Sequence, residues 1–143
     1  MPPNPPLQRT WSSLPLGSRP LNGQVVRRTT EGVMKPLKDA SHLYEVERRV
    51  RYAERAGSRI NELQISPTQQ VPWHYHASIR DTFYVLEGRI RIFLREPKED
   101  VQLGPGDTFT VDPRRPHLVT NAGDRSATFL TLQGVGEFDF VPV

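Results

Sequence analysis

The sequence contains no cysteine, and this absence excludes several kinds of chemistry at once. Without thiols the chain cannot form disulfides, thiolate metal sites or a cysteine nucleophile. No apolar run approaches the ~18 residues that a membrane-spanning helix needs. The first residues, MPPNPPLQRTWSS, lack the apolar core of a secretory signal. We therefore expect a cytoplasmic protein with no membrane association.

The sequence also lacks any block of lysines and arginines, although its formal net charge is +3. In the stretch YEVERRVRYAERAGSR, arginines alternate with Glu45, Glu47 and Glu54, which is typical of a solvated, salt-bridged surface. No zinc-finger spacing and no RNA-binding aromatic signature accompanies them. We therefore expect no nucleic-acid partner.

The 143 residues divide into regions of different character. Prolines crowd residues 1–22, which we expect to form an extended or mobile arm because proline excludes helix and the stretch can bury little apolar surface. Residues 23–143 are long enough for one hydrophobic core and are expected to form a single domain. Within it, residues 23–57 are ambiguous, since HLYEVERRVRYAERAG fits either a short helix or two strands.

From Ser58 onward, short β-rich runs alternate with turn residues. The runs are RINELQI, VPWHYH, TFYVL, RIRIFL, VQL, TFTV, HLVTN, ATFLTLQ and FDFV. The turn at Glu87-Gly88 is typical of a hairpin, with Gly88 at a positive φ. Many short strands at regular spacing predict an all-β sandwich or barrel.

Three of the four histidines form a pattern on these strands. Residues i and i+2 of a strand project from the same face, so His74 and His76 point together, while Asp81 begins the following strand and His117 lies on a later one. Imidazoles in an apolar interior need partners, and a divalent metal satisfies all of them at once. We predict one divalent ion per chain, and without sulfur the donor set suits Fe, Mn, Zn, Ni or Cu. The fourth histidine, His42, is isolated and expected at the surface.

The stretch HYHASIRDTFYVLEG resembles the first signature of the cupin superfamily, in which two histidines, a glutamate and a glycine recur at this spacing. The stretch GDTFTVDPRRPHLVTN resembles the second signature, with His117 in the place of the fourth ligand. The resemblance covers about residues 58–141 and is closest to small single-domain bacterial cupins. It implies a double-stranded β-helix, or jelly-roll barrel, with the metal held by His74, His76, Asp81 and His117.

The sequence departs from these signatures at several positions. Thr68 replaces a glycine of the first signature, while Asp112 and Arg114 replace a proline and a glycine of the second. We therefore expect an altered turn before His117. Asp81 stands in the place of the ligand glutamate and is one methylene shorter. Three alternatives stay open: Asp81 coordinates after a small strand shift, holds a water, or leaves a site of three histidines.

The resemblance implies one of two classes of function. The first is a mononuclear metal-dependent enzyme with dioxygenase, isomerase or lyase chemistry on a small chelating substrate, which could be anionic. The second is a non-catalytic module that binds a small ligand or a metal. Arg114 and Arg115 could attract an anion, although a solvated loop is the simpler interpretation. A homodimer is expected, since small jelly rolls commonly cover edges and outward strand faces by pairing.

Overall fold

The structure is a computed structural model that describes residues 36–143. The arm expected at residues 1–22 lies outside this range, as does the expected start of the domain at residue 23. The described residues contain β-strands and no helix, and therefore no helix long and apolar enough to cross a membrane. The strands are β1 Arg48–Arg55, β2 Ser58–Ile65, β3 Gln70–Tyr75, β4 Arg80–Glu87, β5 Ile90–Leu94, β6 Glu99–Leu103, β7 Thr108–Val111, β8 His117–Asn121, β9 Ala127–Gly134 and β10 Val141–Pro142.

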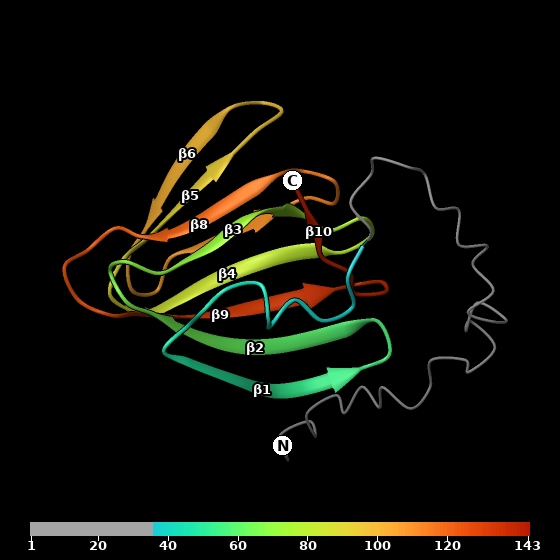
Figure 1. Ribbon diagram of the computed structural model, residues 1–143, viewed down its shortest axis with the longest axis horizontal. Helices are drawn as coiled ribbons and strands as arrows, with labels where there is room; N and C mark the ends of the chain where they lie inside the picture. Colours follow the sequence, from blue (N-terminus) through green and yellow to red (C-terminus); the bar gives the residue numbers. More distant parts are fainter. Residues whose placement is uncertain (1–35) are drawn as a thin grey trace, which may run out of the picture. The chain divides into compact units, whose positions relative to one another are not determined.

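The strands form two five-stranded antiparallel sheets (Figure 1). One sheet has the order β1-β2-β9-β4-β7 and the other the order β10-β3-β8-β5-β6. Most neighbours are therefore distant in sequence, as β2 and β9 or β3 and β8 are. This crossing pattern confirms the all-β jelly-roll fold that the sequence predicts.

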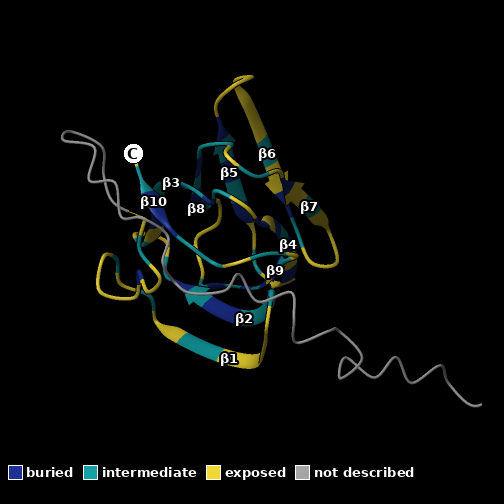
Figure 2. Ribbon diagram, turned by 90° about the vertical axis from the view of Figure 1, so that its right-hand side faces the viewer, coloured by how far each residue is buried: buried dark blue, intermediate teal, exposed yellow. Residues whose placement is uncertain are grey.

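The core lies between the two sheets and is built by period-two alternation. In β5, Ile90, Ile92 and Leu94 are buried while the residues between them are partly exposed. From the other sheet, Phe83 and Phe129 are buried in the same cluster. Inward positions thus appear buried along each strand, while the edge strands β1 and β6 are largely exposed (Figure 2).

The ambiguous segment before Ser58 resolves into a strand over residues 48–55. This strand, β1, pairs antiparallel with β2 and carries a register shift between Arg51 and Ala53. Val46 and Val50 fit both periods, the helical one together with Leu43 and the strand one together with Tyr44. Without β1, the outer edge of β2 would have backbone groups without hydrogen-bond partners. Pairing as a strand satisfies them, which a helix in this segment could not do.

Two turns depend on left-handed backbone. Gly88, between β4 and β5, has a φ of 74°, and its expected positive φ is confirmed. The expected hairpin is wrong, because β4 and β5 lie in different sheets and the turn carries the chain from one sheet to the other. Arg114 stands where the second signature has a glycine and takes a φ of 66°, a conformation that favours glycine. Its backbone N–H donates to the carbonyl of His76 at 2.7 Å, which ties the turn before β8 to the end of β3.

Candidate metal centre

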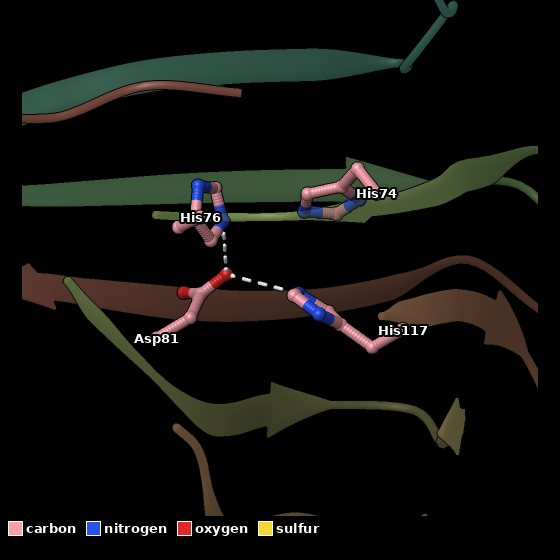
Figure 3. Close-up of side chains that lie close together, drawn as sticks. All are labelled: His74, His76, Asp81 and His117. Atoms are coloured by element: carbon pink, nitrogen blue, oxygen red, sulfur yellow. Dashed lines mark hydrogen bonds and ion pairs between the residues drawn. The ribbon is translucent and has the colours of Figure 1, made fainter. Parts of the chain in front are cut away.

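The structure brings the four sequence-predicted residues together in the interior. His74 lies on β3 and His76 just beyond its end, His117 begins β8, and Asp81 lies on β4. Each is between 1% and 3% exposed. Their ligand atoms all lie within 4.8 Å of one another, so the group could hold a metal ion (Figure 3).

Strand pairing explains this convergence. His74 and His117 are direct partners across the β3–β8 ladder, where a register shift lies between Val71 and His74. Asp81 belongs to the opposite sheet and faces inward with Phe83. The centre therefore spans both sheets, with histidines on one side and a carboxylate on the other.

Each imidazole is oriented by a backbone carbonyl. The Nδ1 atom of His74 lies 2.7 Å from the carbonyl oxygen of Pro72, and that of His117 lies 2.9 Å from the carbonyl of Arg115. Nδ1 of His76 contacts the carbonyl of Asp139 in the same way. Because a carbonyl oxygen only accepts hydrogen bonds, each Nδ1 carries the proton. In a neutral ring the lone pair then lies on Nε2, the arrangement that metal-ligating histidines adopt.

The carboxylate of Asp81 and two of the imidazoles have the spacing of ligands on one ion. Oδ2 of Asp81 lies 3.1 Å from Nε2 of His76 and 3.5 Å from Nε2 of His117. For metal–ligand bonds of about 2.1 Å, ligand atoms lie about 3.0 Å apart at right angles and about 3.4 Å apart in a tetrahedron. Nε2 of His117 is buried and has no hydrogen-bond partner among the described residues. An unsatisfied buried nitrogen at this spacing fits a metal ligand.

Burial and the carboxylate set the protonation of the cluster. Burial holds the pKa of His74 well below 6.5, and charge on His117 and His76 would lower it further. Burial also lowers the pKa of His76, but the contact with Asp81 outweighs it, so this pKa is raised overall. Burial raises the pKa of Asp81, but its contacts with His117 and His76 outweigh burial and hold this pKa well below its usual range. Without metal, Asp81 is therefore ionised, and the neighbouring His76 gains a proton more readily than a free imidazole does. Metal binding to Nε2 of His76 would compete with that proton.

A chain of polar side chains supports Asp81 from behind. Nε2 of Gln133 donates to Oδ1 of Asp81 at 3.5 Å, and Nδ2 of Asn61 donates to Oε1 of Gln133 at 3.1 Å. Nε of Arg51 in turn donates to Oδ1 of Asn61 at 3.0 Å. With Oδ1 held in this way, Oδ2 faces the histidines.

A cavity of about 70 Å³ opens beside the cluster. Its floor includes His74, His76 and Asp81, and its apolar wall includes Phe138 and Phe140 from the segment before β10. Phe140 stacks on the ring of His74 with centroids 4.1 Å apart. The rest of the lining combines loop residues, arginines and polar side chains: Asp39, Ala40, Ser41, Tyr44, Arg49, Arg51, Arg59, Asn61, Leu63, Val71, Phe83, Thr131 and Gln133. The exposed lining residues Ser41 and Arg51 place its mouth at the surface.

The other residues considered from the sequence as ligand-binding or surface residues lie outside this cavity. Arg115 makes an ion pair with Glu99 at 2.8 Å, and Arg114 is exposed in its turn; neither lines the cavity. His42 is exposed, as expected. Sequence reasoning missed the polar residues on the cavity wall, of which Asn61 had a detectable signal. Asn61 lies at every-second-residue spacing from Leu63 and Ile65 on β2, so it is a polar residue on their inward face.

Three structural neighbours share the fold. A protein with a double-stranded β-helix domain from Klebsiella pneumoniae subsp. pneumoniae has a TM-score of 0.59 at 21% identity, covering 80% of this chain and 87% of its own. An oxalate oxidase has a TM-score of 0.56 at 17% identity, covering 61% of this chain and 46% of its own. Oxalate decarboxylase from Lactobacillus farciminis has a TM-score of 0.61 at 15% identity, covering 77% of this chain and 33% of its own. The chain thus spans less than half the length of either oxalate enzyme.

Fold and site together define a protein with a double-stranded β-helix and a buried cluster that could hold a metal. A family model described as the cupin domain matches residues 61–133, just over half of the chain. The chain therefore belongs to the cupin family. No protein of curated function matches it.

Proposed function

We propose that this cupin binds one divalent metal ion through His74, His76, Asp81 and His117, and that it is a mononuclear metal-dependent enzyme. Its chemistry would be that of a dioxygenase, isomerase or lyase acting on a small chelating substrate. The observation that carries the proposal is the convergence of imidazole Nε2 atoms, each ring held by a carbonyl at Nδ1, on one buried carboxylate oxygen.

The cavity supports an enzyme over a simple metal store. A divalent ion in the cluster would supply Lewis-acid chemistry towards a bound oxygen atom. The chain's own part is to bind and orient the substrate and to limit water. Phe138 and Phe140 form an apolar wall over the histidines, and Gln133 fixes the carboxylate. A structural metal would need no such opening beside its ligands.

The alternative is a non-catalytic module that binds a small ligand or a metal. Apart from the cluster, no arrangement of nucleophile and base lies in the cavity lining of the described residues. The discriminating experiment loads the protein with Fe(II) and measures oxygen consumption with small hydroxy acids and enolisable acids. Turnover with any of them favours the enzyme, whereas stoichiometric binding without turnover of these acids favours the module.

Metal binding itself is tested with His117→Ala, using His42→Ala as the matched control because His42 is exposed and outside the cluster. We expect elemental analysis to find one divalent ion per chain in the parent and in His42→Ala, and none in His117→Ala. A ligand that binds only the native state stabilises it by RT ln(1 + [M]/Kd), about 4 kcal/mol at a thousandfold excess over Kd. His117→Ala should lose that metal-dependent stabilisation. Stoichiometric metal and an unchanged metal-dependent rise of the unfolding midpoint in this variant would show that the site is wrong.

We also propose that the protein is a homodimer that pairs through the outer face of the sheet β1-β2-β9-β4-β7. Tyr84 and Leu86 on β4 and Leu132 on β9 are between 37% and 39% exposed on that face. A cytoplasmic location and a bacterial type of cupin stay predictions.

A further inference from the structure

We propose that the cavity beside the cluster is a subsite for a small organic carboxylate, with the guanidinium of Arg49 as its anchor. The proposal deepens the proposed function and rests on it for the role of the metal, since it names the substrate class and a specificity residue of the same site. Neither follows from the signatures, because Arg49 lies on β1, outside both of them.

Arg49 has donor capacity that the described residues do not use. It lines the cavity, and its Nη2 atom is buried without a hydrogen-bond partner. Its guanidinium lies over the ring of Tyr44, with Cζ 4.8 Å from the ring centroid, a cation–π contact. No carboxylate in residues 36–143 forms an ion pair with it. A buried cationic N–H is costly to leave unpaired, so an anionic oxygen in the cavity would be stabilised there.

The neighbouring arginines differ from Arg49 because each already has a partner. Arg51 and Arg59 both pair with Glu54, at 3.1 and 3.2 Å. Asp39, an exposed acidic residue of the lining, accepts a hydrogen bond from the backbone of Ser41 at 2.9 Å and forms no ion pair among the described residues. Arg49 is therefore the arginine of the cavity lining that has no ion-pair partner among the described residues.

The pairing of the strands shows how the arginines lie relative to the cluster of histidines and Asp81. Arg59, Gln133 and Asp81 are successive direct partners on β2, β9 and β4. With neighbouring strands about 4.8 Å apart, the arginine and the carboxylate of this row lie about 10 Å apart at their Cα atoms. Arg49 is the direct partner of Leu63, which lies four residues after Arg59 on β2. Arg49, Arg59 and the cluster line the same cavity, so one ligand in it can face both a guanidinium group and the cluster.

The volume and the lining of the cavity limit the class of ligand that it can bind. One ordered water needs about 10–15 Å³, so a cavity of about 70 Å³ holds a molecule of a few non-hydrogen atoms. The apolar side chains of Leu63, Val71 and Phe83 suit an organic body better than a strongly hydrated inorganic anion such as phosphate. The planar fork of arginine matches a carboxylate through two parallel hydrogen bonds. A second oxygen of the same molecule would then face the cluster, as chelation requires.

The test uses malonate as the probe and neutral malonamide as its control. Binding is measured by calorimetry and by the shift of the unfolding midpoint, in the metal-free and the zinc-loaded protein. The variants are Arg49→Gln, Arg49→Lys and Arg125→Gln; the last removes one positive charge at an exposed position far from the cavity lining. Circular dichroism and the midpoint without ligand check that each variant is folded.

We expect malonate to bind the parent and Arg125→Gln equally, and malonamide to bind neither. Arg49→Gln should bind malonate at least tenfold more weakly while its zinc affinity stays that of the parent. Arg49→Lys, which keeps the charge without the fork, should be intermediate, and it decides the test if Arg49→Gln does not fold. Parent-like malonate binding by Arg49→Gln, or no malonate binding by the parent in either metal state, would overturn the subsite. Arg49-dependent malonate binding in a parent that takes up no metal would leave the subsite standing and defeat the proposed metal function instead.

Discussion

Asp81 is the residue where the chain differs most from the first cupin signature, because aspartate is shorter than the glutamate expected there. The structure compensates in two ways. Oδ2 of Asp81 lies 3.1 Å from Nε2 of His76, and Gln133 holds the other carboxylate oxygen. The reach lost with one methylene is about 1.5 Å, the length of one C–C bond. A small displacement of β4 would supply it, which favours direct ligation over a water-mediated contact.

Substitution of Asp81 tests this choice. If the carboxylate is a ligand, Asp81→Ala should weaken metal affinity markedly, by tenfold or more, since removing even an outer-shell partner costs about 10–100-fold. Asp81→Glu should bind metal at least as well as the parent, because the longer side chain reaches further. Titration of both variants with a divalent metal at neutral pH measures the effect. Equal affinities of Asp81→Ala and the parent would instead show that the histidines suffice.

At the residue scale, the cluster could be predicted from the sequence and the anchor Arg49 could not. The spacing of His74 and His76 places both rings on one strand face, and this is local information. The burial of Arg49 depends instead on the pairing of β1 with β2 and on Tyr44, a residue from the preceding loop. Sequence alone gave β1 two competing periods, so which of its arginines face inward could not be read from it.

At the element scale, the strand runs after Ser58 were predictable because turn residues separate them and inward positions alternate. The order of the strands in the sheets was not, since neighbours such as β2 and β9 are far apart in sequence and pair through hydrogen bonds that no local pattern encodes. The arrangement follows from the resemblance to cupins rather than from composition. The role of Phe138 and Phe140 could not be predicted either. The sequence indicated only a strand there, whereas the two rings form the wall over His76 and His74.

The connection between β4 and β5 depends on Gly88 for two separate reasons. Its φ of 74° is left-handed, and a Cβ there would lie 2.7 Å from the carbonyl oxygen of Ser126 and 2.9 Å from Cα of Ala127. Gly106 provides a matched control, with a φ of 84° and no atom within 4 Å of an added Cβ. Each Gly→Ala change should cost about 1 kcal/mol for the backbone conformation.

We expect Gly88→Ala to cost at least about 1 kcal/mol more than Gly106→Ala, because the backbone of β9 must move to admit the methyl group. Urea unfolding of the metal-free proteins measures the difference without any contribution from the site. Equal losses of unfolding free energy in the two variants would mean that the close contact at Gly88 relaxes freely.

At the scale of the whole molecule, the outer face of the sheet β1-β2-β9-β4-β7 is the surface most in need of a partner. Leu132 lies in register with Ile60 on one side and Thr82 on the other, and Leu130 with Tyr84. Apolar side chains thus lie side by side on adjacent strands of this face, next to Thr82 and Glu62 in the same rows. A stable interface buries about 800 Å² on each partner, an area that only a broad sheet face or an edge of this molecule can supply.

Leu132→Glu tests the dimer, because pairing through this face would bury an unpaired carboxylate near a copy of itself. We expect sedimentation equilibrium to find a dimer for the parent and an at least tenfold weaker association for Leu132→Glu. Leu43→Glu is the control: Leu43 is similarly exposed, at 41%, but lies in the turn after Ala40 rather than on the sheet face. If the parent sediments as a monomer at high concentration, the dimer proposal is wrong. If Leu43→Glu weakens association as much as Leu132→Glu does, the outer sheet face is not the specific interface, since any added charge would then have the same effect.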